Sequence, residues 1–139
     1  MASATDWRSR IGGWLQRESR VTPPRQVLVV DAVEGSRAHA GVLLTALGYA
    51  PLLVSTQADA VAALETEDPT FLLLGFTLDD GDGLTALGAL REVAPEVPIA
   101  MLAPSLWDPR VAEAMRRGAV AYLAPPFGAD DLRELLGRS

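Results

Sequence analysis

The sequence predicts a single doubly wound α/β domain, in which helices cover both faces of a five-stranded parallel sheet. Two observations predict this fold class: residues 26–139 contain five short apolar segments, and each is followed by a segment with helical spacing of apolar residues. Strands that are apolar throughout are typical of sheets buried on both faces. A strict alternation of strands and helices requires right-handed crossovers between parallel strands. With 139 residues, the chain is long enough to bury one core.

The first half of the domain contains three expected strands and two expected helices. Residues 26–31 read QVLVVD, a β-branched run that ends in an acid and is typical of a buried strand. Three leucines at helical spacing predict a helix over 36–47, and Gly48 suits the positive φ that often ends a helix. The pattern then predicts a strand over 51–54, a helix over 58–65 and a strand over 71–74.

The second half repeats the alternation twice. A helix is expected over 84–94, because Pro95 disfavours a helical conformation in the residue before it. Asp108 and Pro109 suit the N-cap and first position of a helix that runs to Arg117 and ends at Gly118. The remaining expected elements are strands over 98–102 and 120–123 and a helix over 130–136.

Charge divides the chain into an N-terminal extension, residues 1–25, and the α/β domain, residues 26–139. The extension carries five arginines against two acids, whereas the domain carries seven arginines against sixteen acids. Pro23 and Pro24 favour an extended linker between the two parts. Because phosphate contacts need clustered cations, we do not expect the acidic domain to bind nucleic acid.

The extension carries an apolar stripe at helical spacing, formed by Trp7, Ile11, Trp14 and Leu15. Two consecutive glycines interrupt it, and each costs about 1 kcal/mol relative to alanine in a helix. Such a helix needs a surface to pack against, and three surfaces remain open. These are its own domain or a twin chain, another protein with the tryptophans as anchors, and an anionic membrane. The membrane is the least favoured, because the segment is short and its positive balance is small.

Composition excludes several kinds of chemistry. The chain has no cysteine and no lysine, and His39 is its single histidine. Disulfides, thiolate catalysis, lysine amines and histidine clusters are therefore absent, and no nucleophile and base pair can be proposed for an enzyme. No apolar run spans a bilayer and the N-terminus lacks a secretory pattern, so we expect a cytoplasmic protein.

Several short segments occur in an order and spacing that resemble the response-regulator receiver (CheY-like) family over 26–139. These segments are VLVVD at 27–31, LGY at 47–49, DGL at 82–84, RRGAVAYL at 116–123 and PPF at 125–127. The resemblance implies a flavodoxin-like (βα)5 fold with the strand order 2-1-3-4-5. The N-terminal helical extension would be an addition to that fold.

The resemblance also implies a phosphorylation site at the strand ends, where this chain has other residues. Receivers transfer a phosphoryl group to an aspartate at the end of strand three, with Mg²⁺ held by that aspartate, by acids after strand one and by a backbone carbonyl. A Ser or Thr after strand four and a Lys after strand five hold the phosphoryl oxygens. The matching positions here are Asp31 followed by Ala32, then Gly75, Ala103 and Pro125. We therefore expect a degenerate pseudo-receiver that lacks the phosphoacceptor and binds no metal or cofactor.

Acidic residues near the altered site have two interpretations each. Asp79, Asp80 or Asp82 could accept a phosphoryl group in place of the lost aspartate. We favour solvated loop acids with an N-cap at Asp82, because a carboxylate displaced by four or more residues would not reach the same pocket. Asp31 could keep residual metal binding, but one carboxylate is a poor start for a hard cation, so a polar strand end is favoured.

Two further residues take their expected conformation from the resemblance. Tyr122 matches an aromatic residue that swings inward on activation in many receivers. The space left by Gly75 and Ala103 would let it stay inward, and an exposed ring on an edge strand is the equally weighted alternative. The Pro125–Pro126 bond matches the family's Lys-Pro bond, which is usually cis, so we expect a cis peptide here.

These observations favour a phosphorylation-independent protein–protein interaction module in bacterial signal transduction or regulation. The resemblance implies that a protein partner, or a second copy in a homodimer, binds the surface of the fourth helix, fifth strand and fifth helix. The candidate residues, some of which could equally pack onto the sheet, are Val111, Met115, Arg116, Tyr122, Asp131 and Arg133. The alternative is a small-molecule sensor that binds at the C-terminal strand ends, in the vacated phosphorylation pocket.

Overall fold

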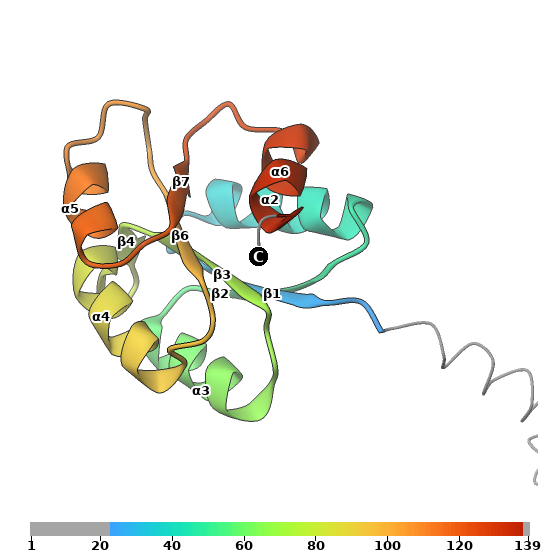
Figure 1. The fold of residues 1–139 in the computed structure, drawn as a ribbon, viewed down its shortest axis with the longest axis horizontal. Coiled ribbons are helices and arrows are strands. Elements are labelled where there is room, and N and C mark those ends of the chain that lie inside the picture. Colours follow the sequence, from blue (N-terminus) through green and yellow to red (C-terminus); the bar gives the residue numbers. More distant parts are fainter. Residues whose placement is uncertain (1–22, 138–139) are drawn as a thin grey trace, which may run out of the picture.

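A computed structural model describes residues 23–137, which contain a five-stranded parallel sheet in the order β2-β1-β3-β6-β7 (Figure 1). Its strands are β1 (Gln26–Val30), β2 (Ala50–Val54), β3 (Phe71–Gly75), β6 (Ile99–Leu102) and β7 (Ala121–Leu123). Val30 at the end of β1 pairs with Val54 on one side and Leu74 on the other, so the carboxyl ends of these strands share one edge. The predicted fold class and strand order are confirmed.

The helices cover both faces of this sheet, as the crossovers require. On one face, α2 (Glu34–Ala46) packs beside α6 (Ala129–Gly137). On the other face, α3 (Gln57–Thr66), α4 (Gly83–Val93) and α5 (Arg110–Arg116) lie side by side (Figure 1). The expected helices all form, with ends within three residues of the predicted ones.

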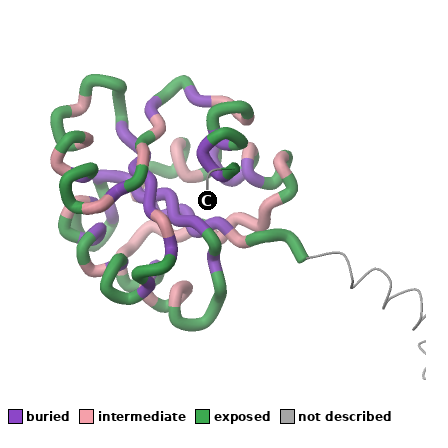
Figure 2. The backbone as a smooth tube through the Cα atoms, viewed as in Figure 1, coloured by how far each residue is buried: buried purple, intermediate pink, exposed green. Residues whose placement is uncertain are grey.

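Alternate side chains of each central strand enter two separate apolar clusters. In β1, Leu28 and Val30 belong to the cluster under α3 and α4, whereas Val27 and Val29 belong to the cluster under α2 and α6. Each of these side chains is fully buried, and full burial of one such side chain contributes about 2 kcal/mol. Figure 2 shows the buried residues concentrated along the central strands. Burial on both faces explains why these strands are apolar throughout rather than alternating.

Two of the predicted helix ends, at Gly48 and Gly118, are confirmed, and the start predicted at Asp108 and Pro109 is one residue too early. Gly48 and Gly118 have φ angles of 91° and 108°, a region that favours glycine. The helix α5 begins at Arg110 with Pro109 as the residue before it, and the Asp108 carboxylate accepts the Arg110 N–H at 2.9 Å, so Asp108 still satisfies one N–H group at the start of the helix. The backbone freedom of glycine and a hydrogen bond from a nearby side chain therefore determine where these helices end and begin.

A small antiparallel hairpin follows β3, where the sequence predicted only a loop. It consists of β4 (Thr77–Leu78) and β5 (Gly81–Asp82). Strands of two residues are too short to leave a periodic pattern in the sequence. The hairpin connects the end of β3 to the start of α4, so it sets the position of α4 beside the carboxyl edge of the sheet.

The expected stripe Trp7, Ile11, Trp14 and Leu15 lies outside the described residues, so its three interpretations remain predictions. Within residues 23–137, no helix has the length and apolar character needed to cross a membrane.

Candidate functional site

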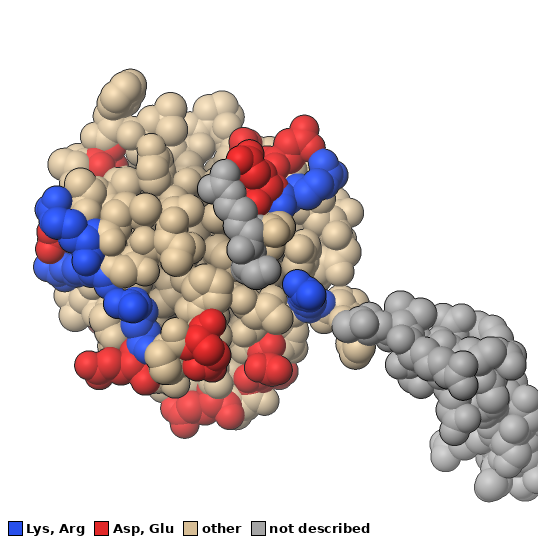
Figure 3. Space-filling view, viewed as in Figure 1, with Lys and Arg blue, Asp and Glu red and all other residues tan. Residues whose placement is uncertain are grey.

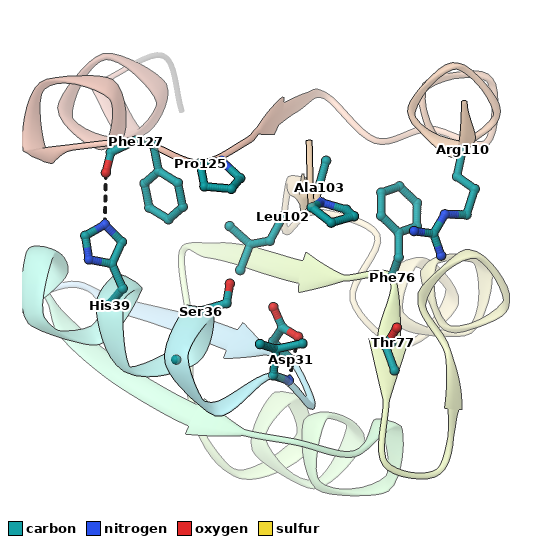
Figure 4. Close-up of a pocket in the computed structure, with 13 residues that line it drawn as sticks. Asp31, Ser36, His39, Phe76, Thr77, Leu102, Ala103, Arg110, Pro125 and Phe127 are labelled. Carbon is teal, nitrogen blue, oxygen red and sulfur yellow. Dashed lines mark hydrogen bonds between the residues drawn. The ribbon is translucent and has the colours of Figure 1, made fainter. Parts of the chain in front are cut away.

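A cavity of about 390 Å³ lies at the carboxyl edge of the sheet, above the ends of β1, β3 and β6. Its lining combines the start of α2, the segment after β3, the segment after β6 and the segment after β7 (Figure 4). In open α/β sheets this edge is where ligands bind. The cavity therefore occupies the place where the sequence predicts the altered phosphorylation pocket.

The carboxylate of Asp31 fills the space directly above Gly75. A Cβ atom built on Gly75 would lie 2.5 Å from the Asp31 Cγ atom and 2.7 Å from each carboxylate oxygen. Such distances are far inside van der Waals contact, so the present position of Asp31 requires a residue without a side chain at position 75. The aspartate at the end of β1 and the glycine at the end of β3 are thus parts of one structural arrangement.

Asp31 is buried, with only 4% of its surface exposed. One carboxylate oxygen accepts the Val33 N–H at 2.9 Å, and the other points into the cavity between Ser36 and Ala103 (Figure 4). Burial raises the pKa of Asp31 above its ordinary value, while hydrogen bonds from Val33 and Ser36 and the charge of Arg37 oppose this shift. The effect of burial on the pKa is therefore larger than the combined effect of these hydrogen bonds and of the nearby positive charge.

Phe76 and Arg110 form one side of the cavity. The Arg110 guanidinium lies 4.5 Å from the centre of the Phe76 ring, a cation–π arrangement. The same guanidinium makes a two-point contact with Asp108, at 2.9 Å through Nε and 2.7 Å through Nη2. The hydrogen bond from Arg110 lowers the pKa of Asp108, so this pair is charged and mutually compensated at neutral pH.

His39 and Phe127 form the opposite side. The Nε2 atom of His39 lies 2.9 Å from the Phe127 carbonyl oxygen, and because a carbonyl only accepts, Nε2 carries the proton. The two rings meet edge to face with centres 5.0 Å apart. Pro125 also lines this side, and the Pro125–Pro126 peptide is cis, as predicted.

The loop acids after β3 have structural roles. Asp80 accepts the N–H groups of Gln57 at 2.7 Å and Ala58 at 3.1 Å, and these bonds at the start of α3 lower its pKa. Asp82 is the N-cap of α4, as predicted, and its hydrogen bond from the Thr85 N–H lowers its pKa. Neither residue lines the cavity. The favoured interpretation of these acids agrees with this geometry.

Tyr122 does not fill the cavity. Its side chain is 40% exposed on β7, so the structure has the exposed ring that was one of the two alternatives, and the inward position is wrong for this structure. The space beside Ala103, which is 4% exposed, instead belongs to the cavity. The expectation that the smaller residue leaves a hollow is therefore supported by the geometry at this position.

The candidate partner residues are distributed over α5, β7 and α6. Met115 is 40% exposed, while Val111 is partly buried and packs against the core, so packing explains Val111. The surface charges are paired locally, since Arg116 contacts Glu113 and Arg133 contacts Asp130. Asp131 accepts the Gly128 N–H at 2.8 Å near the start of α6.

The described residues place few potential metal ligands near one another. Among residues 23–137, no group of three or more His, Cys, Asp or Glu side chains is placed to hold an ion. Asp31 contributes one carboxylate, and Ala32 contributes no side-chain oxygen. A hard cation prefers six or more oxygen ligands.

Sequence reasoning missed several residues that line the cavity, namely Ser36, His39, Thr77, Arg110 and Phe127. No sequence motif marks these residues, and only the folded arrangement of the helices and loops brings them to the cavity. Ser36 and His39 stand one turn apart at the start of α2, which faces the carboxyl edge of β1. Phe127 was seen only as part of the PPF segment, with no indication that it would meet His39.

Comparison with known proteins places the chain in a family. The family model described as "Response regulator receiver domain" matches residues 27–137. Regulatory protein LuxO of Vibrio cholerae is 36% identical over 90 residues, which is 65% of this chain and 20% of LuxO. Photosynthetic apparatus regulatory protein RegA of Rhodobacter capsulatus is 27% identical over 112 residues, 81% of this chain and 61% of RegA. The chain thus spans about a fifth of the length of LuxO.

Solved structures show the same fold. The receiver domain of NtrX from Brucella abortus superimposes with a TM-score of 0.74 at 28% identity, covering 81% of this chain and 95% of that domain. A CheY-like receiver domain protein from Methanospirillum hungatei gives a TM-score of 0.73 at 22% identity, covering 83% of this chain and 92% of that protein. The strand order, the cavity at the carboxyl edge and the family match all agree, and the chain belongs to the response regulator receiver domain family of two-component signalling.

Proposed function

We propose that this receiver domain is a pseudo-receiver, which acts as a phosphorylation-independent protein–protein interaction module. One observation carries the proposal: β3 ends in Gly75, and the Asp31 carboxylate occupies the space where a side chain at position 75 would begin. Phosphoryl transfer needs a nucleophile and groups that neutralise charge on the phosphoryl oxygens. The positions that would supply these groups have lost them, because Gly75 has no side chain and Ala103 and Pro125 supply no hydroxyl or ammonium group.

The surface formed by α5, β7 and α6 supports binding of a partner. Figure 3 shows a broad face between α5 and α6 that carries few charged side chains and is bordered by charged groups. Exposed apolar side chains occur on these elements and the loops beside them, at Met115, Val120 and Tyr122. The loop before α5 adds Trp107, which is 89% exposed, and large aromatic residues often anchor protein interfaces.

Phosphorylation independence is tested directly with a phosphodonor. The protein is incubated with acetyl phosphate and Mg²⁺, and the intact mass is measured beside a receiver that has its phosphoacceptor aspartate. We expect the control to gain one phosphoryl group and this protein to gain none. A stable adduct would contradict the proposal, and peptide mapping would then show whether Asp79, Asp80 or Asp82 carries it.

The interaction role is tested by affinity capture with and without phosphodonor. Trp107→Ala and Tyr122→Ala should each weaken recovery of a defined partner. Leu53→Ala is a matched control, because Leu53 is 44% exposed on the edge strand β2 at the other side of the sheet. Equal loss in all three variants, or recovery that requires the phosphodonor, would contradict the proposal. Sedimentation of the purified chain distinguishes a homodimer from a separate partner.

The cavity favours a second candidate function, a small-molecule sensor. Its volume of about 390 Å³ is within the range of ligand sites, roughly 300–1,000 Å³. Tyr122 does not line it, and Phe76 forms one wall. A ligand that binds there should raise the midpoint of thermal unfolding with concentration. The signal of such a sensor would be a change in partner binding.

A further inference from the structure

The cavity at the strand ends has mainly apolar walls and a single carboxylate among its lining residues. Asp31 lies at its floor, where one carboxylate oxygen accepts the Val33 N–H, the Ser36 side chain also hydrogen-bonds the carboxylate, and the carboxylate faces the cavity (Figure 4). The walls are supplied by seven apolar or proline residues: Val33, Phe76, Leu102, Ala103, Pro104, Pro125 and Phe127. A ligand here would meet a negative group on one side and hydrocarbon surface around it.

The nearby cationic groups are directed elsewhere. Arg110, the one arginine of the lining, is paired at two points with Asp108. Arg37 donates its Nη1 hydrogen bond to the backbone carbonyl of Asp31, at 2.7 Å, rather than to the carboxylate. His39 uses its Nε2 proton on the Phe127 carbonyl. The Arg110–Asp108 pair is neutral as a unit. Among the described lining residues, Asp31 is therefore the one carboxylate without a direct ion-pair partner, although the positive charge of Arg37 lies near it.

Size limits the ligand. A water molecule takes roughly 30 Å³ in the liquid, so a cavity of about 390 Å³ holds a molecule with about a dozen non-hydrogen atoms. A buried carboxylate is stabilised when an opposite charge approaches it and the remaining lone pairs receive hydrogen bonds. An ammonium group provides both, since it carries a positive charge and three donors.

We propose that the cavity binds a small organic amine, whose ammonium group contacts the Asp31 carboxylate and the Ser36 hydroxyl while its apolar body lies against Phe76, Leu102 and Phe127. The inference rests on the second proposed function and names the chemical class of its ligand. An anionic ligand is disfavoured because it would place like charges together in a dry site. Mg²⁺ is disfavoured because, among residues 23–137, Asp31 is the only carboxylate that lines the cavity.

The test compares three probes of similar size: 2-phenylethylamine, 2-phenylethanol and phenylacetate, which are cationic, neutral and anionic at neutral pH. Affinity is measured by titration calorimetry with the full chain, up to millimolar concentrations. We expect the amine to bind most tightly and phenylacetate least tightly. Asp31→Asn keeps the size of the side chain and removes its charge. It should weaken the amine by about ten- to a hundredfold, the usual effect of losing a charged hydrogen bond.

Two further variants separate charge from volume. Glu34→Gln makes the same charge change on an exposed residue of α2 that does not line the cavity, and it should leave the affinity for the amine unchanged. Ala103→Leu keeps Asp31 and fills the cavity, so it should weaken the amine and the alcohol alike. Circular dichroism of each variant confirms that it is folded before its affinity is interpreted.

The outcomes distinguish failure of this inference from failure of the sensor function. If the alcohol binds as tightly as the amine, or if Asp31→Asn leaves the amine unaffected, the inference is overturned and a neutral-ligand sensor remains. If only phenylacetate binds, the charge assignment is wrong and the sensor remains. If none of the three probes binds the wild-type chain, both the inference and the sensor function are overturned. The protein–protein interaction module would then be the one proposed function that remains.

Discussion

Asp31 and Asp82 carry the same side chain at neighbouring places in the fold, yet their environments shift their pKa values in opposite directions. Asp82 is exposed at the start of α4, where the Thr85 N–H lowers its pKa. Asp31 is buried above Gly75, where loss of water raises its pKa. The first carboxylate has a structural role because it satisfies helix N–H groups. The second faces a cavity, and a perturbed group in a cavity is a candidate functional group.

The two regions meet at Gly83, the first residue of α4. A Cβ atom at this position would collide with the carbonyl oxygen of Gly75 and with the Phe76 backbone. Gly83 therefore allows the capped end of α4 to approach the end of β3. The hydrogen bond from the Gly83 N–H to the Phe76 carbonyl, at 2.9 Å, fixes this approach. The shape of the cavity thus depends on a residue that does not line it.

Gly83→Ala should destabilise the protein most, because the new methyl group would push the start of α4 away from the end of β3. The backbone must move to admit the methyl group, so we expect the free energy of unfolding to fall by about 3 kcal/mol. Urea denaturation measures this change. The matched control is Gly88→Ala in the same helix, where a Cβ atom meets nothing within 4 Å. It should raise the free energy of unfolding by about 0.5–1 kcal/mol, and equal destabilisation by both variants would contradict the argument.

Gly75→Ala should have the second largest effect, about 2 kcal/mol of destabilisation, because the new methyl group displaces the Asp31 carboxylate. In an Asp31→Ala background the same change should cost half as much or less. The double-mutant cycle is measured by urea denaturation of the four proteins. Strictly additive costs would show that Asp31 does not fill the space above Gly75.

Asp82→Ala should destabilise the protein by about 1 kcal/mol, the typical cost of removing an N-cap. Thermal unfolding followed by circular dichroism is sufficient for this measurement. Asp79→Ala tests a neighbouring acid of the same loop. The Asp79 backbone N–H donates to the Ser55 carbonyl oxygen, and this hydrogen bond is kept when the side chain is replaced by alanine. We expect a change of about 0.5 kcal/mol or less. If Asp79→Ala proves as harmful as Asp82→Ala, capping is not the role that distinguishes them.

The pH dependence of stability should show the smallest effect, because partners of Asp31 oppose the cost of its burial. Its pKa is higher in the folded than in the unfolded protein. The resulting stabilisation is complete below the unfolded pKa and is lost as pH rises through the folded pKa. Asp31→Asn removes this loss, so the variant should gain stability relative to wild type as pH rises from about 3 to 8, by on the order of 1 kcal/mol or less.

Asp82 is the control for these pH measurements, because folding shifts its pKa in the opposite direction to that of Asp31. Its pKa is lowered on folding, so its stabilisation is present above the unfolded pKa and is lost as pH falls through the folded pKa. The advantage of wild type over Asp82→Ala should therefore shrink in acid. Parallel pH curves for Asp31→Asn and Asp82→Ala, each relative to wild type, would show that burial does not distinguish the two carboxylates.

Some parts of the site could be predicted from sequence and others could not. The order of apolar strands predicted which residues end β1, β3 and β6, and therefore that Asp31, Gly75 and Ala103 share one edge. The hairpin of residues 77–82 was missed because its strands are too short to show a period. The orientation of Tyr122 was undecided, because the same strand position suits an inward or an outward ring.

The sequence by itself determined the fold class, the strand order and the loss of a side chain at position 75. These follow from periodicity, turn chemistry and the resemblance carried by short motifs, which depend on neighbouring residues. Only the tertiary structure decided that the Asp31 carboxylate occupies the space above Gly75, that Asp80 accepts hydrogen bonds at the start of α3, and that His39 meets Phe127 beside a cavity. These contacts join residues far apart in the chain, and their positions depend on how helices pack against the finished sheet.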